Sequence, residues 1–150
     1  MYSPNGSTFI SASDDETIKE WNRVSGQCVF EYKGHNGWVY SVAYAPNGKT
    51  FISSSDDRTV KEWDITTGKC ICTYEGHDDS VRFVAYAPNG YSFLSGSEDG
   101  VVLIWSTEKG ECIQVIQNYP GLIVHGCDMR NLHKESSIDK DILQQYGAIV

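Results

Sequence analysis

Residues 34–64 read GHNGWVYSVAYAPNGKTFISSSDDRTVKEWD, and the same pattern returns elsewhere in the chain. Short runs rich in Val, Ile, Phe, Tyr and Ser are separated by turn residues such as Pro46-Asn47-Gly48 and Asp56-Asp57-Arg58. No run is long enough or periodic enough for a helix, so the pattern favours short strands. With the residues that follow it, the stretch predicts four strands, at 38–45, 49–55, 59–63 and 70–75.

The pattern repeats with a period of 42 residues, which indicates stacked copies of one structural unit. Tryptophans, serine-rich triplets, acidic pairs, Pro-Asn-Gly turns and Gly-x-Cys motifs all keep this spacing. They begin at residues 21, 63 and 105; 11, 53 and 95; 14, 56 and 98; 4, 46 and 88; and 26, 68 and 110. Gly34-His35 returns as Gly76-His77, but the next equivalent is Asn118-Tyr119. We therefore expect a repeat domain over 1–118 and a non-repeat tail over 119–150.

These motifs resemble the WD-repeat family of β-propellers, because Gly34-His35 is followed by Trp63-Asp64 and Gly76-His77 is followed by Trp105-Ser106. The resemblance covers residues 1–118. It implies an all-β fold, a partial propeller of about two and two-thirds four-stranded antiparallel blades, to which the tail adds a short C-terminal helix. The aspartate that follows the tryptophan in the family is kept only at Asp64.

The resemblance also implies a buried hydrogen-bond chain in each blade, which we call the tetrad. It runs from a Trp through a Ser and a His to the Asp of a tight turn. The second blade would use Trp63, Ser53, His35 and Asp57. The third would use Trp105, Ser95, His77 and Asp99, and the first keeps Trp21, Ser11 and Asp15.

Ser, His and Asp in one network would also suit a catalytic triad, but the sequence favours a structural role. A triad occurs once and needs an exposed nucleophile with oxyanion donors, whereas this set occurs twice and its Ser also pairs with an indole N–H. The acidic turns, and Cys70-x-Cys72 with His77, are weak metal candidates because each supplies too few ligands in one place. We therefore expect neither an enzyme nor a bound metal or cofactor.

Partner recognition is expected where the blades differ, since positions shared by every copy build the scaffold. In the family, three positions per blade commonly point onto one rim where peptides and proteins dock. Here they are Trp38, Tyr40 and Asp56 in the second blade, Ser80, Arg82 and Glu98 in the third, and Asp14 in the first. Trp, Tyr and Arg are common in binding hot spots. The alternative for Trp38 and Tyr40 is packing against the neighbouring blade.

Composition narrows the partner class and the compartment. The 150 residues carry a formal net charge of −8 and no cluster of Lys and Arg, which argues against a nucleic-acid partner. No segment approaches the roughly 20 apolar residues of a membrane helix, and the first residues lack a signal-peptide pattern. Three of the five cysteines, at 28, 70 and 112, occupy one repeat position, so we expect reduced thiols and a cytoplasmic protein.

The sequence suggests an incomplete propeller. Residues 1–4 align with 43–46, so the sequence begins at the end of a first strand. A closed propeller needs about 4 to 8 blades, and fewer blades leave open strand edges. Three explanations stand: the chain is part of a longer propeller protein, several copies assemble into a ring, or the gene is a truncated remnant. The first is the expectation that we favour.

The tail over 119–150 differs from the repeats. Leu122-Ile123-Val124 aligns with the start of a blade, and Ser136 to Asp139 resembles a capping box before a helix. The apolar face of that helix would carry Ile138, Ile142, Leu143 and Tyr146. Residues 126–132 and 146–149 resemble tails that follow WD repeats in large bacterial multidomain signalling proteins.

The sequence therefore predicts a non-catalytic scaffold that binds a peptide or protein partner on the propeller rim. The alternative from another class is an oligomerisation module, a homo-oligomer that works through open blade edges and the tail helix. Neither nucleic acid nor a membrane is expected as a partner.

Overall fold

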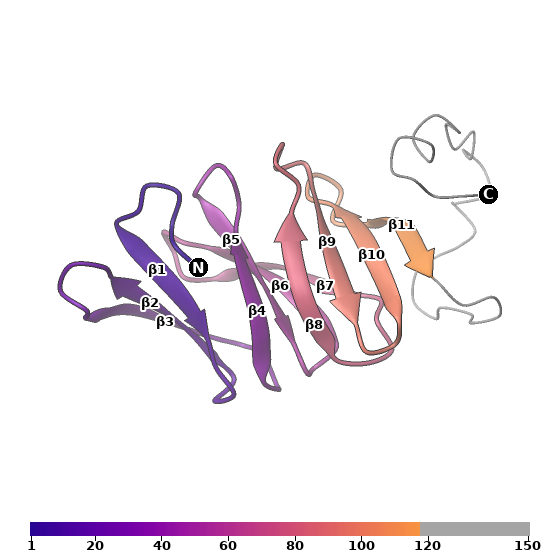
Figure 1. Cartoon of the computed structure of the whole chain (residues 1–150), viewed down its shortest axis with the longest axis horizontal. Coiled ribbons are helices and arrows are strands. Elements are labelled where there is room, and N and C mark those ends of the chain that lie inside the picture. Colours follow the sequence, from indigo (N-terminus) through magenta and orange to yellow (C-terminus); the bar gives the residue numbers. More distant parts are fainter. Residues whose placement is uncertain (118–150) are drawn as a thin grey trace.

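The computed structural model describes residues 1–117, which form eleven strands and no helix (Figure 1). The strands are β1 (Thr8–Ala12), β2 (Thr17–Asn22), β3 (Cys28–Lys33), β4 (Val39–Tyr44), β5 (Thr50–Ser55), β6 (Thr59–Asp64), β7 (Cys70–Glu75), β8 (Val81–Tyr86), β9 (Ser92–Ser97), β10 (Val101–Ser106) and β11 (Cys112–Gln117). The four strands predicted in the second unit correspond to β4–β7 within one residue at every end. None of the described residues belongs to a helix that could cross a membrane.

The strands form three antiparallel sheets that follow the order of the sequence. They are β1-β2-β3, β4-β5-β6-β7 and β8-β9-β10-β11. The sheets lie side by side in a row, with β4 and β8 next to one another (Figure 1). Each strand joins its neighbour through a short turn, as an antiparallel hairpin requires. The predicted all-β partial propeller is therefore confirmed, and each sheet is called a blade below.

One irregularity recurs in every blade. The register of the third strand against the fourth shifts directly before the tryptophan, between Glu20 and Trp21, between Glu62 and Trp63, and between Ile104 and Trp105. The extra residue lies on the fourth strand, and such a bulge bends the strand that carries it. It is Val29, Ile71 or Ile113 in the successive blades. Its repetition gives the three indoles equivalent positions in their blades.

The core lies between neighbouring blades. The cluster between the first and second blades contains Ile10, Ile18, Tyr32, Val39, Tyr44, Phe51 and Trp63. The cluster between the second and third contains Ala43, Ile52, Val60, Tyr74, Val81, Val84, Phe93, Val101, Leu103 and Trp105. Because burial of apolar surface drives folding, each blade depends on its neighbour for stability.

The first blade has three named strands. Met1 and Tyr2 align with Ala43 and Tyr44 at the end of β4 and lie in the equivalent place beside β1, since Met1 N donates to Ile10 O at 2.8 Å and Tyr2 pairs with Phe9. The whole tail over 119–150, with its predicted helix after Ser136 and the strand-like Leu122-Ile123-Val124, lies outside the described residues.

Candidate functional site

The tetrad of the second blade is complete, with Trp63, Ser53 and His35 buried and Asp57 partly buried. His35 lies in the loop before β4, with Nδ1 2.7 Å from Asp57 Oδ2 and Nε2 2.7 Å from Ser53 Oγ. Ser53 Oγ also accepts a 2.8 Å hydrogen bond from Trp63 Nε1. The indole N–H can only donate, so Ser53 accepts from Trp63, and an ionised carboxylate can only accept, so the Nδ1–H of His35 donates to Asp57. The chain of bonds ties the loop before β4 to β5, β6 and the turn between them.

The other blades repeat this arrangement to different extents. In the third blade the His77–Asp99, His77–Ser95 and Trp105–Ser95 distances are 2.8, 2.7 and 2.8 Å. In the first blade Trp21 donates to Ser11 at 2.9 Å. Asp15, which has no histidine partner among the described residues, accepts from Thr17 and from Lys19.

Burial decides what a Ser-His-Asp arrangement of this kind can do. Ser53 and Ser95 have no exposed surface, and both histidines are buried. A nucleophile must reach the carbonyl carbon of its substrate, and neither serine is in contact with solvent. The hydrogen bonds instead satisfy polar groups inside the blade that would otherwise be buried without partners.

Asp57 is the charged end of its tetrad. Burial opposes its ionisation, but hydrogen bonds from the His35 ring, Thr59 and the backbone N–H of Asn36 outweigh that effect. Together they hold the pKa of the Asp57 carboxyl well below its usual value. The carboxylate therefore stays ionised at neutral pH and keeps the proton of His35 on Nδ1.

The seven residues predicted for partner binding lie at the end of the sheets where β4 and β8 begin. We call this set, Asp14, Trp38, Tyr40, Asp56, Ser80, Arg82 and Glu98, the acidic rim. Backbone hydrogen bonds hold its parts together: Asp56 N donates to Trp38 O at 2.8 Å and Glu98 N to Ser80 O at 3.0 Å. A third, from Val39 N to Ser13 O at 3.1 Å, crosses from the second blade to the first.

A hydrogen-bonded network joins the second blade to the third on the acidic rim. The Tyr40 hydroxyl donates to Asp56 Oδ1 at 3.0 Å, and the Ser80 hydroxyl donates to the same oxygen at 2.6 Å. Both bonds lower the pKa of Asp56, and the bond from Ser80 has the larger effect. Asp56 therefore remains a fixed negative charge between two blades.

Arg82 extends this network. Its guanidinium carbon lies 3.9 Å from the centroid of the Tyr40 ring, a cation–π contact. Its Nε and Nη2 both donate to Glu98 Oε1, at 2.9 and 2.7 Å. The hydrogen bond to Glu98 raises the pKa of Arg82. The pair is exposed and adds little stability, but it fixes the orientation of a cation over an aromatic ring.

Trp38 and Tyr40 differ in their surroundings. The Trp38 side chain is 53% exposed and belongs to neither core cluster. Tyr40 is partly buried and contacts the neighbouring blade through Arg82. The structure thus places the larger aromatic side chain on the surface and the smaller one in a contact between blades.

Sequence reasoning missed a second polar contact between blades. Tyr74 and Tyr86, from adjacent blades, donate to Glu62 at 2.9 and 3.2 Å. Tyr32 donates to Glu20 in the same way at 3.0 Å. The Glu–Tyr pair follows the repeat period in two copies, so the repeat alignment held a signal for it. The third copy has isoleucines at both positions.

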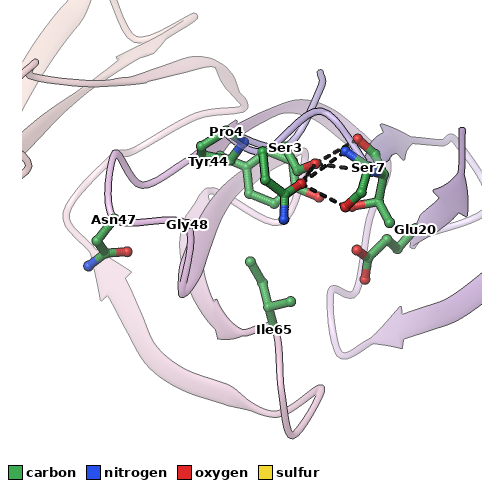
Figure 2. Close-up of a pocket in the computed structure, with 10 residues that line it drawn as sticks. Ser3, Pro4, Ser7, Glu20, Tyr44, Asn47, Gly48 and Ile65 are labelled. Carbon is green, nitrogen blue, oxygen red and sulfur yellow. Dashed lines mark hydrogen bonds between the residues drawn. The ribbon is translucent and has the colours of Figure 1, made fainter.

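A pocket of about 250 Å³ lies between the first and second blades (Figure 2). It lies where the equivalent of the Tyr86–Glu62 bond, between Tyr44 and Glu20, is not formed. The Tyr44 hydroxyl, the equivalent of the Tyr86 hydroxyl, is buried there without a hydrogen bond in the part of the chain that the structure describes. Glu20 lines the pocket, and Ser3 and Ser7, both hydrogen-bonded to Asn5, form another part of its wall (Figure 2). The space can hold several water molecules.

Comparison with known protein families gives a match that covers all three blades. The model of the family described as WD domain, G-beta repeat, matches residues 1–22, 26–64 and 68–106. Each matched segment ends one residue after a tetrad tryptophan. The comparison with curated proteins found no match.

Proposed function

The chain belongs to the WD40 repeat family, whose members are typically non-catalytic and mediate protein interactions, and we propose that it is a scaffold that binds a peptide or protein partner on the acidic rim. The observation that carries this proposal is the combination of a fixed polar network and an exposed tryptophan. Asp56 accepts hydrogen bonds from Tyr40 of its own blade and from Ser80 of the next blade, while Trp38 keeps 53% of its surface exposed.

Such an arrangement suits binding for two physical reasons. Side chains that are already ordered lose little conformational entropy when a partner docks, which leaves more of the contact energy for affinity. A large aromatic residue such as Trp38 buries much apolar area in one contact and is a frequent hot spot. The family's rim positions and these local properties support the same surface.

The experiment that tests the proposal is a selection of short random linear peptides on the purified chain, followed by affinity measurements on variants. We expect the selected peptides to lose most of their affinity for the double variant Trp38→Ala, Tyr40→Ala. Val24→Ala and Tyr91→Ala are matched controls, because both side chains are exposed, at 88% and 74%, near the turns at the opposite end of the blades.

Peptides that bind the double variant as tightly as the wild-type chain would overturn the proposal. A larger loss of affinity in the control variants would also overturn it, because the peptides would then bind at the opposite end of the blades.

A second candidate function is self-association through the edge of the first blade. On the side of β1 that faces away from β2, the described residues that pair with β1 are Met1, Tyr2 and Ser3. No described strand pairs there with Ser11 and Ala12. Exposed backbone groups on a strand edge can accept a strand from another copy. Light scattering coupled to size exclusion should then give a discrete dimer or trimer. A monomer at every concentration would exclude this candidate.

A further inference from the structure

Trp38 lies beside the acidic turn of the first blade. The backbone bond from Val39 N to Ser13 O, 3.1 Å long, brings the residue before β4 next to Asp14. Both Trp38 and Asp14 are exposed. Within residues 1–117, the Asp14 carboxylate makes no hydrogen bond and no ion pair. The first junction between blades therefore places an exposed tryptophan and an exposed aspartate on adjoining backbone segments, and no described residue pairs with that carboxylate.

The second junction shows how the equivalent positions are satisfied. Ser80 and Asp56 follow Trp38 and Asp14 by one repeat, and there the serine hydroxyl donates to the carboxylate at 2.6 Å. A tryptophan in place of that serine removes the hydroxyl donor and supplies an aromatic face instead. Lys19, on the strand that follows the first acidic turn, is held by Asp15 and Glu31 at 3.2 and 3.7 Å.

The rim itself shows which chemistry suits an aromatic ring beside a carboxylate. Arg82 lies over the Tyr40 ring and donates two hydrogen bonds to Glu98. The ring quadrupole attracts the cation, and the charged hydrogen bonds fix its direction. Tyr40 and Glu98 thus hold a basic side chain of the chain itself, whereas Trp38 and Asp14 hold none from the described residues.

We propose that Trp38 and Asp14 bind a lysine or arginine side chain of the protein partner. The inference rests on the proposed function and names the class of partner, a peptide segment with at least one basic residue. Tryptophan is the aromatic residue that attracts cations best. The formal net charge of −8 favours the approach of such a segment, since long-range attraction speeds association.

The test uses a peptide selected on the wild-type chain, in which each Lys and Arg is replaced in turn by Gln. We expect one replacement to weaken binding to the wild-type chain by about tenfold. The same replacement should have little effect on the double variant Asp14→Asn, Trp38→Ala, which lacks the site. Asp78→Asn is the matched control, because it removes an exposed carboxylate from the same end of the blades and changes the net charge equally.

Each outcome separates this inference from the proposed function. Peptides that need the rim but no basic residue would overturn the inference and leave the proposed function standing. The inference would also be overturned if the same Lys or Arg replacement in the peptide had little effect on binding to Asp78→Asn. Net charge alone would then explain the result. Peptides that bind the double variant Trp38→Ala, Tyr40→Ala as tightly as the wild-type chain would overturn both.

Discussion

Ser53 and Ser54 are neighbours in β5, and both are fully buried, but their hydroxyls differ in hydrogen bonding. Ser53 Oγ bonds to both Trp63 and His35, whereas Ser54 Oγ has no partner among the described residues. A buried hydroxyl without a partner keeps its desolvation cost and gains no bond in return. The two serines should therefore contribute to stability in opposite ways.

Ser53→Ala should lower the free energy of unfolding by about 1–3 kcal/mol, because it leaves the indole N–H of Trp63 buried without an acceptor. Ser54→Ala is the matched control and should leave the free energy of unfolding unchanged or raise it slightly. Equilibrium unfolding in urea measures both. Equal losses in the two variants would contradict a stabilising role for the tetrad.

The lowered pKa of Asp57 has a defined consequence for stability against pH. Its pKa in the folded chain lies below the value of about 3.9 expected in the unfolded chain. The unfolded state therefore binds the proton first, and the contribution of Asp57 is complete above that value and lost as the pH falls below it. Carboxyl signals followed by NMR during acidification should show Asp57 still ionised below about pH 3.9. A titration midpoint at or above that value would contradict the account.

The tetrad residues were predictable because they recur at the repeat period and match a family motif. The bond between Ser80 and Asp56 was not, since the position of Ser80 holds Trp38 in the preceding copy and the repeat carries no signal there. Contacts that depend on a difference between copies become visible only when the blades are placed side by side.

At the scale of single elements, the β5–β6 turn contains a strained residue. Arg58 has a φ of 68°, and Glu16 in the first blade has the same value. The third blade has Gly100 there, with a φ of 81°. Left-handed backbone is costly for residues with a Cβ and readily adopted by glycine.

Arg58→Gly should raise the free energy of unfolding by up to about 1 kcal/mol, the relief of left-handed strain less the added flexibility of the unfolded chain. Arg58→Ala is the control, because it removes the charge and keeps the Cβ. Thermal or urea unfolding of both variants distinguishes them. A gain in the alanine variant as large as in the glycine variant would assign the effect to charge.

Strand positions followed closely from the sequence because Pro46-Asn47-Gly48 and Asp56-Asp57-Arg58 mark the turns on both sides of β5. The bulge on the strand opposite each tryptophan did not follow. A register shift by one residue depends on how the indole packs against the next strand, and the spacing of residues along the chain does not reveal it.

At the scale of the whole molecule, the acidic rim exists only because the blades stand in a row. Asp14, Tyr40 and Arg82 come from three different blades, and the contacts between blades hold the rim together. The sequence predicted which residues belong to this rim through the family resemblance. It did not predict that Asp56 joins two blades or that Arg82 covers the Tyr40 ring.

The four tryptophans allow one measurement that tests rim binding directly. Trp63 and Trp105 donate their indole N–H groups to buried serines, while Trp38 is exposed on the rim. In a proton–nitrogen NMR spectrum recorded during titration with a selected peptide, the indole signal of Trp38 should shift and those of Trp63 and Trp105 should stay in place. An unchanged Trp38 signal, with shifts instead at residues such as Tyr91 at the opposite end, would contradict the account.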